Sequence, residues 1–181
     1  MSVFAEVNSM SKSPTLIRFP GVLSTIILAL MLAATPLAAD QVTGSVNGEA
    51  LQWHVLEADD GKTVNFREDF PGFYSITIQA HREARYAVEG SISITFSLMG
   101  DDVLDATAMY FGESRMTPHF VDESAIDGLV LERVALEGDE PRIVGRYEGV
   151  LNHRSSMFGE PDPTNTVSLL VEFDVTPTRE N

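Results

Sequence analysis

Alternation of apolar and polar residues with a period of two dominates the chain after residue 39. Residues 91–98 show it most clearly, because every even-numbered position is apolar and every odd one is a serine or a threonine. This period buries one face of a β-strand and leaves the other face to water. The last strand repeats it with five apolar residues on one face, namely Val167, Leu169, Val171, Phe173 and Val175.

Turn residues separate these segments. Asn47-Gly48 joins residues 41–46 to residues 49–57, and this dipeptide is the strongest short signal for a hairpin with a type I′ turn. Further reversals are predicted at 59–61, 100–102, 127–128 and 137–141, and two longer connections at 67–72 and 155–165. No segment after Pro36 keeps a helical period for three turns. The pattern predicts an all-β, single-domain antiparallel β-sandwich or barrel of about eight to ten short strands.

Two glycines interrupt one predicted strand on its apolar side. Gly145 and Gly149 alternate with Ile143, Tyr147 and Leu151. Glycines in such positions are typical of a tight bend, a bulge or a neighbouring side chain that lies across the backbone. A tryptophan or a phenylalanine would fill that space, and we favour packing over ligand contact as the interpretation.

The first 39 residues have the composition of an export signal. Lys12 and Arg18 precede an apolar run over 22–34, and the small residues 37–39 follow it. A basic start, an apolar middle and a small-residue exit define a secretory signal peptide. A membrane anchor is disfavoured, because a spanning helix needs about 20 apolar residues. We therefore predict a signal peptide over 1–39.

Cleavage after this segment would leave one all-β domain over 40–181, and Met10 is an alternative true start. The residue after the predicted cut is Asp40, and the chain has no cysteine, so a lipid anchor attached through cysteine is excluded. Disulfides and thiolate metal sites are excluded as well. We expect a periplasmic or secreted protein held together by its apolar core.

The charge balance is strongly acidic. The 181 residues include 12 Lys and Arg against 27 Asp and Glu, for a net charge of −15 at pH 7. Such a field repels phosphate backbones and anionic lipid surfaces, so nucleic acid and membrane partners are disfavoured. Protein, glycan and small-molecule partners stay open.

Metal chemistry has little support in the sequence. No two of the four histidines stand at a metal-ligand spacing, and we interpret them as surface or strand-end residues: His54, His81, His119 and His153. Acidic turns could supply oxygen ligands for Ca²⁺, but aspartate also binds its own backbone in turns, which is the interpretation we favour. These turns lie at 59–61, 101–102, 122–127 and 160–162. We predict no metal and no cofactor.

Catalytic motifs are equally weak. Residues 112–116 begin like a nucleophile elbow around Ser114 but lack its second glycine. We assign no catalytic residue. Trp53, on an alternating segment, is expected in the core. If some of the aromatic residues, tyrosines and phenylalanines included, face outward together, they would favour carbohydrate or peptide binding.

These observations favour an exported, non-enzymatic β-sandwich that acts as a binding or accessory protein of unknown specificity. The alternatives are a small-ligand carrier with a closed β-barrel cavity, a surface-assembly subunit that uses an exposed edge strand, and a small hydrolase. Strand order, oligomeric state and ligand do not follow from the sequence.

Overall fold

The computed structural model describes residues 40–58, 61–112, 120–156 and 159–180. Within these ranges the protein is all-β, with 13 strands, one short 3₁₀ helix and no α-helix. Accordingly, no helix in the described part of the chain has the length and apolar character to span a bilayer. The elements are β1 (Gln41–Val46), β2 (Glu49–Trp53), β3 (Glu57–Ala58), β4 (Gly61–Lys62), β5 (Val64–Phe70), β6 (Phe73–Ala80), β7 (Ile92–Met99), β8 (Asp102–Tyr110), β9 (Phe120–Asp122), η1 (Ala125–Gly128), β10 (Leu129–Ala135), β11 (Arg142–His153), β12 (Asp162–Val175) and β13 (Thr178–Arg179).

Eleven of these strands form one sheet, in the order β13-β5-β6-β7-β8-β9-β11-β12-β1-β2, with β10 paired to β11. The strands β3 and β4 form a separate two-stranded ribbon. Neighbouring strands are antiparallel except for β13, which runs parallel to β5. The sheet does not close, because β13 and β2 lie at opposite ends of the order.

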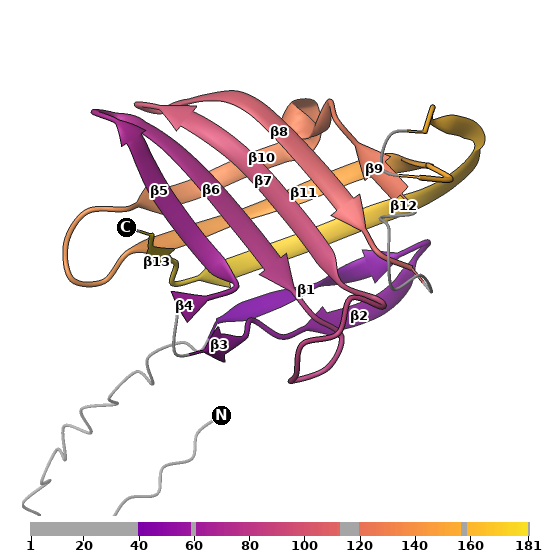
Figure 1. The fold of residues 1–181 in the computed structure, drawn as a ribbon, viewed down its shortest axis with the longest axis horizontal. Helices are drawn as coiled ribbons and strands as arrows, with labels where there is room; N and C mark the ends of the chain where they lie inside the picture. Colours follow the sequence, from indigo (N-terminus) through magenta and orange to yellow (C-terminus); the bar gives the residue numbers. More distant parts are fainter. Residues whose placement is uncertain (1–39, 59–60, 113–119, 157–158, 181) are drawn as a thin grey trace, which may run out of the picture. The chain divides into compact units, whose positions relative to one another are not determined.

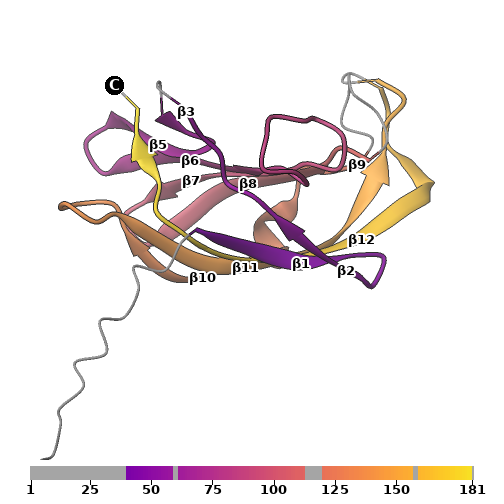
Figure 2. The same cartoon turned by 90° about the horizontal axis from the view of Figure 1, so that it is seen from below.

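The sheet bends into two layers (Figure 2). One layer holds β5 to β8, and the other holds β1, β2 and β10 to β12 (Figures 1 and 2). The short strand β9 joins them, because it pairs with β8 on one side and with β11 on the other. Side chains from both layers form one buried cluster, which includes Ile78, Ile94 and Phe96 from the first layer and Tyr147, Leu169 and Val171 from the second. The alternation of apolar residues therefore places a single core between the layers.

The predicted alternation is confirmed in β7 and β12. In both strands the apolar positions are buried and most of the intervening polar ones are at least partly exposed. The connection predicted over 67–72 is wrong, since β5 continues to Phe70 and leaves only residues 71–72 as a turn. A bulge between Glu68 and Phe70 explains the broken alternation there. Two-residue strands, which carry no period, raise the strand count above the predicted range.

The hairpin between β1 and β2 is confirmed. Asn47 and Gly48 both have positive φ, 51° and 81°, as a type I′ turn requires. The second strand is shorter than predicted and ends at Trp53. The next residue, His54, instead forms an isolated antiparallel bridge with His81.

The packing interpretation of the two strand glycines is confirmed. A Cβ at Gly145 would lie 2.5 Å from the Val130 carbonyl oxygen and 2.9 Å from the Phe173 ring. A Cβ at Gly149 would overlap the hydroxyl of Tyr147. One phenylalanine and one tyrosine therefore occupy the space that the missing side chains leave.

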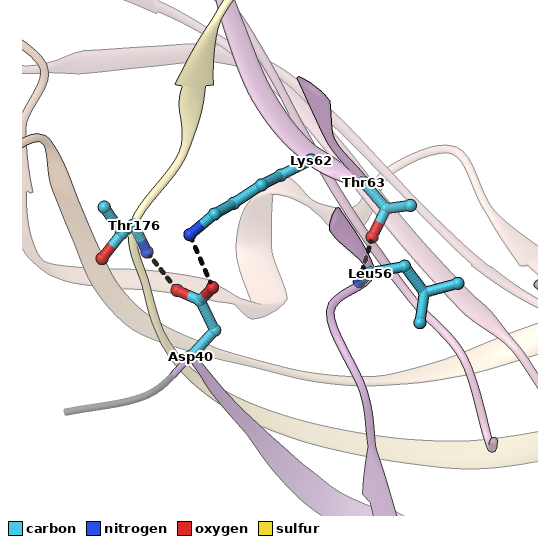
Figure 3. Close-up of polar contacts among 5 residues, drawn as sticks. All are labelled: Asp40, Leu56, Lys62, Thr63 and Thr176. Carbon is cyan, nitrogen blue, oxygen red and sulfur yellow. Dashed lines mark hydrogen bonds and ion pairs between the residues drawn. The ribbon is translucent and has the colours of Figure 1, made fainter. Parts of the chain in front are cut away.

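The first described residue is already bonded into the domain (Figure 3). The Asp40 carboxylate accepts a hydrogen bond from the Thr176 backbone N–H at 2.7 Å and pairs with the Lys62 ammonium at 3.0 Å. Beside it, the Leu56 N–H donates to the Thr63 hydroxyl at 3.0 Å. These contacts tie the start of β1 to the end of β12 and to β4. Both carboxylate oxygens of Asp40 have partners, so the cluster is structural.

Candidate binding pocket

The connection between β6 and β7 forms a pocket of about 620 Å³. Residues 82–83 and 85–90 line it from the loop, and Tyr110 and Gly112 line it from the end of β8. A volume of this order is typical of small-ligand sites. The loop therefore presents a concave surface large enough for a small ligand.

Two buried polar side chains fix the shape of this loop from within. His81 and Ser91 flank it, and both are fully buried. The His81 Nδ1 lies 2.7 Å from the Ala87 carbonyl oxygen, and the Ser91 hydroxyl donates to the Val88 carbonyl oxygen at 2.6 Å. Buried polar groups of this kind hold a single conformation when their partners are in place.

The indole of Trp53 supports the loop from the core. Its Nε1–H donates to the Gly90 carbonyl oxygen at 2.9 Å, and the indole is 1% exposed, which confirms its predicted place in the core. Gly90 has φ of +72°, and a Cβ there would overlap the Arg82 side chain. Glycine is therefore required at this position on two grounds.

Further hydrogen bonds join the loop to β2. The Arg82 guanidinium donates to the Gln52 carbonyl oxygen at 3.1 Å. The backbones of His54 and His81 exchange two hydrogen bonds, at 2.7 and 2.9 Å. The base of the pocket is thus fixed to the second layer of the sheet as well as to β6 and β7.

The outer part of the loop is exposed to solvent. Tyr86 is 69% exposed, and the half-buried Tyr110 faces the same pocket. The Arg85 guanidinium pairs with the Glu83 carboxylate at 2.5 Å, and this hydrogen bond holds the pKa of Glu83 below its usual range. Two arginines and two glutamates line the pocket, so their formal charges cancel within a strongly acidic chain.

The structure separates the four histidines. His81 follows directly on β6, at a strand end as predicted, and its side chain is fully buried. His54 is exposed and His153 is half-buried at the end of β11, while His119 lies outside the described residues. A sequence pattern could not reveal the burial of His81, because its Nδ1 is satisfied by a carbonyl six residues along the loop.

In two of the acidic turns, the aspartates Asp122 and Asp162 accept hydrogen bonds from neighbouring backbone N–H groups. Asp122 accepts hydrogen bonds from the Ser124 N–H and hydroxyl at 3.0 and 2.9 Å, and from the Tyr147 hydroxyl at 2.8 Å. Asp162 likewise accepts the Thr164 N–H at 2.9 Å. Across the described ranges, no group of three or more His, Asp or Glu side chains is placed to hold a metal ion.

The weak nucleophile motif around Ser114 lies outside the described residues. Comparisons with protein-family models, with curated proteins and with solved structures find no match to this chain.

Proposed function

We propose that this chain is an exported, non-enzymatic binding protein whose ligand site is the pocket of the β6–β7 loop. The observation that carries the proposal is the contrast within the loop. His81, Ser91 and Trp53 hold it through buried hydrogen bonds, whereas Tyr86 is displayed to solvent. A loop held in one shape before binding loses little entropy when a ligand arrives, and such preorganisation favours affinity.

The chemistry of the lining favours a neutral saccharide unit as the ligand. Tyrosine rings offer flat apolar faces that suit the C–H face of a sugar ring, and their hydroxyls add hydrogen bonds. Arg82, Arg85, Glu83 and Glu89 supply donors and acceptors for sugar hydroxyls while their charges cancel. An anionic ligand would meet the acidic remainder of the chain, so a neutral one fits better.

Trp53 gives a direct test, because it is the only tryptophan and its N–H is bonded to the pocket residue Gly90. The chain over residues 40–181 is titrated with glucose, galactose, mannose and N-acetylglucosamine, with tryptophan emission and calorimetry as the two readouts. At least one sugar should bind the wild type, and Tyr86→Ala should weaken binding at least tenfold. Phe70→Ala is the matched control, because Phe70 is 50% exposed and lies outside the pocket lining. No binding by any sugar, or equal loss in both variants, contradicts the proposal.

We infer that the bent sheet works as a sandwich, and this favours the binding-module function over a barrel carrier. The space between the layers is occupied by the buried cluster, and the pocket lies outside that cluster. The hydrolase alternative finds little support in the loop, because His81 and Ser91 each bind a carbonyl group rather than each other.

One specific observation, the unpaired edge of β10, favours a surface-assembly role. In the described residues β10 pairs only with β11, so its other edge can accept a further strand, and Val130 and Val134 are exposed on it. The register shift between Leu131 and Arg133 works against pairing, because bulged edges resist association. Light scattering over a tenfold concentration range checks this: a concentration-dependent mass would favour assembly.

Export is part of the proposal and rests on the composition of residues 1–39. Mass spectrometry of the protein from the periplasm or medium of its own host should give the mass of residues 40–181. A full-length chain that stays in the cytoplasm would contradict export while leaving the pocket hypothesis intact.

A further inference from the structure

One ring nitrogen at the base of the β6–β7 loop has no partner among the described residues. The His81 side chain is fully buried, and its Nε2 makes no hydrogen bond within this part of the chain. Its Nδ1 faces the Ala87 carbonyl oxygen at 2.7 Å, and a carbonyl can only accept. Nδ1 must therefore carry a proton, and in the tautomer that has its single proton there, Nε2 is an acceptor that lacks a donor. Leaving such a group unsatisfied costs free energy, which a native structure usually avoids.

The ring of Tyr86 contacts this histidine. The two ring centroids lie 5.0 Å apart, with the planes tilted by 50°. Tyr86 also lines the pocket, and 69% of it is exposed. His81 does not line the pocket itself, but it is in ring contact with a residue that does.

We infer that His81 Nε2 is a specificity-determining acceptor, which takes a hydrogen bond from one hydroxyl of the bound saccharide when Tyr86 turns aside. This inference rests on the proposed function of the pocket. It adds that the ligand must carry a donor at one defined position, because an Nδ1-protonated imidazole offers only a lone pair at Nε2. Sites built around a buried polar group reject analogues that leave it unsatisfied much more strongly than apolar pockets reject a missing methylene.

The first test needs no sugar and asks whether Tyr86 is the cover. Diethyl pyrocarbonate acylates the unprotonated nitrogen of a histidine, and peptide mass spectrometry gives the rate at each site. In the wild type His81 should react at least tenfold more slowly than the exposed His54, which is the internal control. Tyr86→Ala should raise the His81 rate at least tenfold and leave His54 unchanged, whereas Tyr86→Phe, which keeps the ring, should stay slow. An unchanged His81 rate in Tyr86→Ala overturns the inference.

The second test uses the tightest-binding sugar of the titration panel and ¹⁵N NMR of the histidine rings in the full domain. Binding should shift the His81 Nε2 resonance and leave that of His54 in place. A deoxy analogue that lacks the contacting hydroxyl should bind at least tenfold more weakly and give no shift. Sugar binding without a His81 shift overturns this inference alone. If no sugar binds, the proposed function fails instead, so the two failures are distinguishable.

Discussion

The pair of strands β11 and β12 and the loop between β6 and β7 achieve a fixed shape by different means. In the strands, Phe173 and Tyr147 lie across glycines, and apolar contact fills the space between the layers. In the loop, His81 and Ser91 bind backbone carbonyls, and few apolar side chains take part. Packing fixes the first region, where side chains fill the space between the layers. Hydrogen bonding fixes the second while its outer face stays open.

The difference predicts how each region responds to damage. A close-packed interior cannot absorb an added methyl group without moving backbone or rings. A hydrogen-bonded surface loop can open by itself, because its opening exposes little apolar area. Substitutions in the strands should therefore lower global stability, and substitutions in the loop should act locally.

The largest effect is expected for Gly145→Ala. Its new Cβ meets the Val130 backbone and the Phe173 ring, and overpacking of this kind costs about 1–3 kcal/mol. Urea denaturation followed by circular dichroism measures the loss. Gly112→Ala is the control, because its nearest atom, on Tyr110, would lie 3.6 Å away, an ordinary contact. Equal stability of the two variants would show that the strands are not close-packed.

Tyr147→Phe should come next, with a loss of about 1–2 kcal/mol, because it removes the hydroxyl that donates to Asp122 at 2.8 Å. Burial, and then this hydrogen bond, raise the pKa of Tyr147 above its usual value. The folded state then keeps a proton that the unfolded chain releases near pH 10, so stability is complete below that pH and falls above it.

Urea titrations between pH 7 and pH 11 check this prediction. The alkaline loss should be smaller in Tyr147→Phe, while Tyr74→Phe, in the opposite layer, should keep the wild-type slope. A slope in Tyr147→Phe equal to that of the wild type would contradict the assignment.

A smaller and local effect is expected for Ser91→Ala. The change removes the hydroxyl bond to the Val88 carbonyl, which still accepts the Ser91 N–H at 3.0 Å, so the loss is about 1 kcal/mol. Hydrogen exchange measured by mass spectrometry should speed up over 81–90 and stay unchanged in β11 and β12. Uniform acceleration would mean that the loop is part of the global folding unit.

The smallest effect belongs to Asp174→Asn on the outer side of β12. Arg142 binds the carboxylate in a bidentate manner at 2.7 and 2.5 Å, and this hydrogen bonding lowers the pKa of Asp174. Since the side chains are 38% and 34% exposed, solvent screens the pair and its contribution stays below about 1 kcal/mol.

The sign of its pH dependence follows from the lowered pKa. The stabilisation is present above the unfolded carboxyl pKa near 3.9 and is lost as the pH falls through the folded value. Asp174→Asn should therefore flatten the acid limb of a urea titration from pH 7 to pH 2, and the exposed Glu137→Gln should not. If Asp174→Asn and the wild type lose stability equally as the pH falls, the Arg142–Asp174 ion pair does not contribute to stability.

Sequence reasoning was most successful where one periodic signal decides the structure. The alternation in β7 and β12, the hairpin at Asn47-Gly48 and the core position of Trp53 follow from local rules. The continuous bent sheet could not be predicted, because it depends on β9, a strand of three residues with no period to read. By contrast, the alternation of apolar residues alone is enough to predict a single buried core.

The pocket was beyond sequence reasoning for a different reason. The loop of residues 81–90 is polar and looks like an ordinary connection, and Arg82 beside His81 indicates only a strand end. The buried histidine bonds to a carbonyl within the loop and contacts the Tyr86 ring, and neither contact has a sequence pattern. The conditional prediction that outward-facing aromatic residues would favour carbohydrate or peptide binding is the signal that pointed in this direction.

The Asp40 cluster has a consequence for the order in which the domain folds. The Asp40 carboxylate binds the Thr176 N–H, 136 residues further along the chain. A chain made from its N-terminus cannot form this contact until nearly all of it has been synthesised. The beginning of β1 is therefore fixed to the end of β12 only at a late stage, after the intervening strands are available to pair.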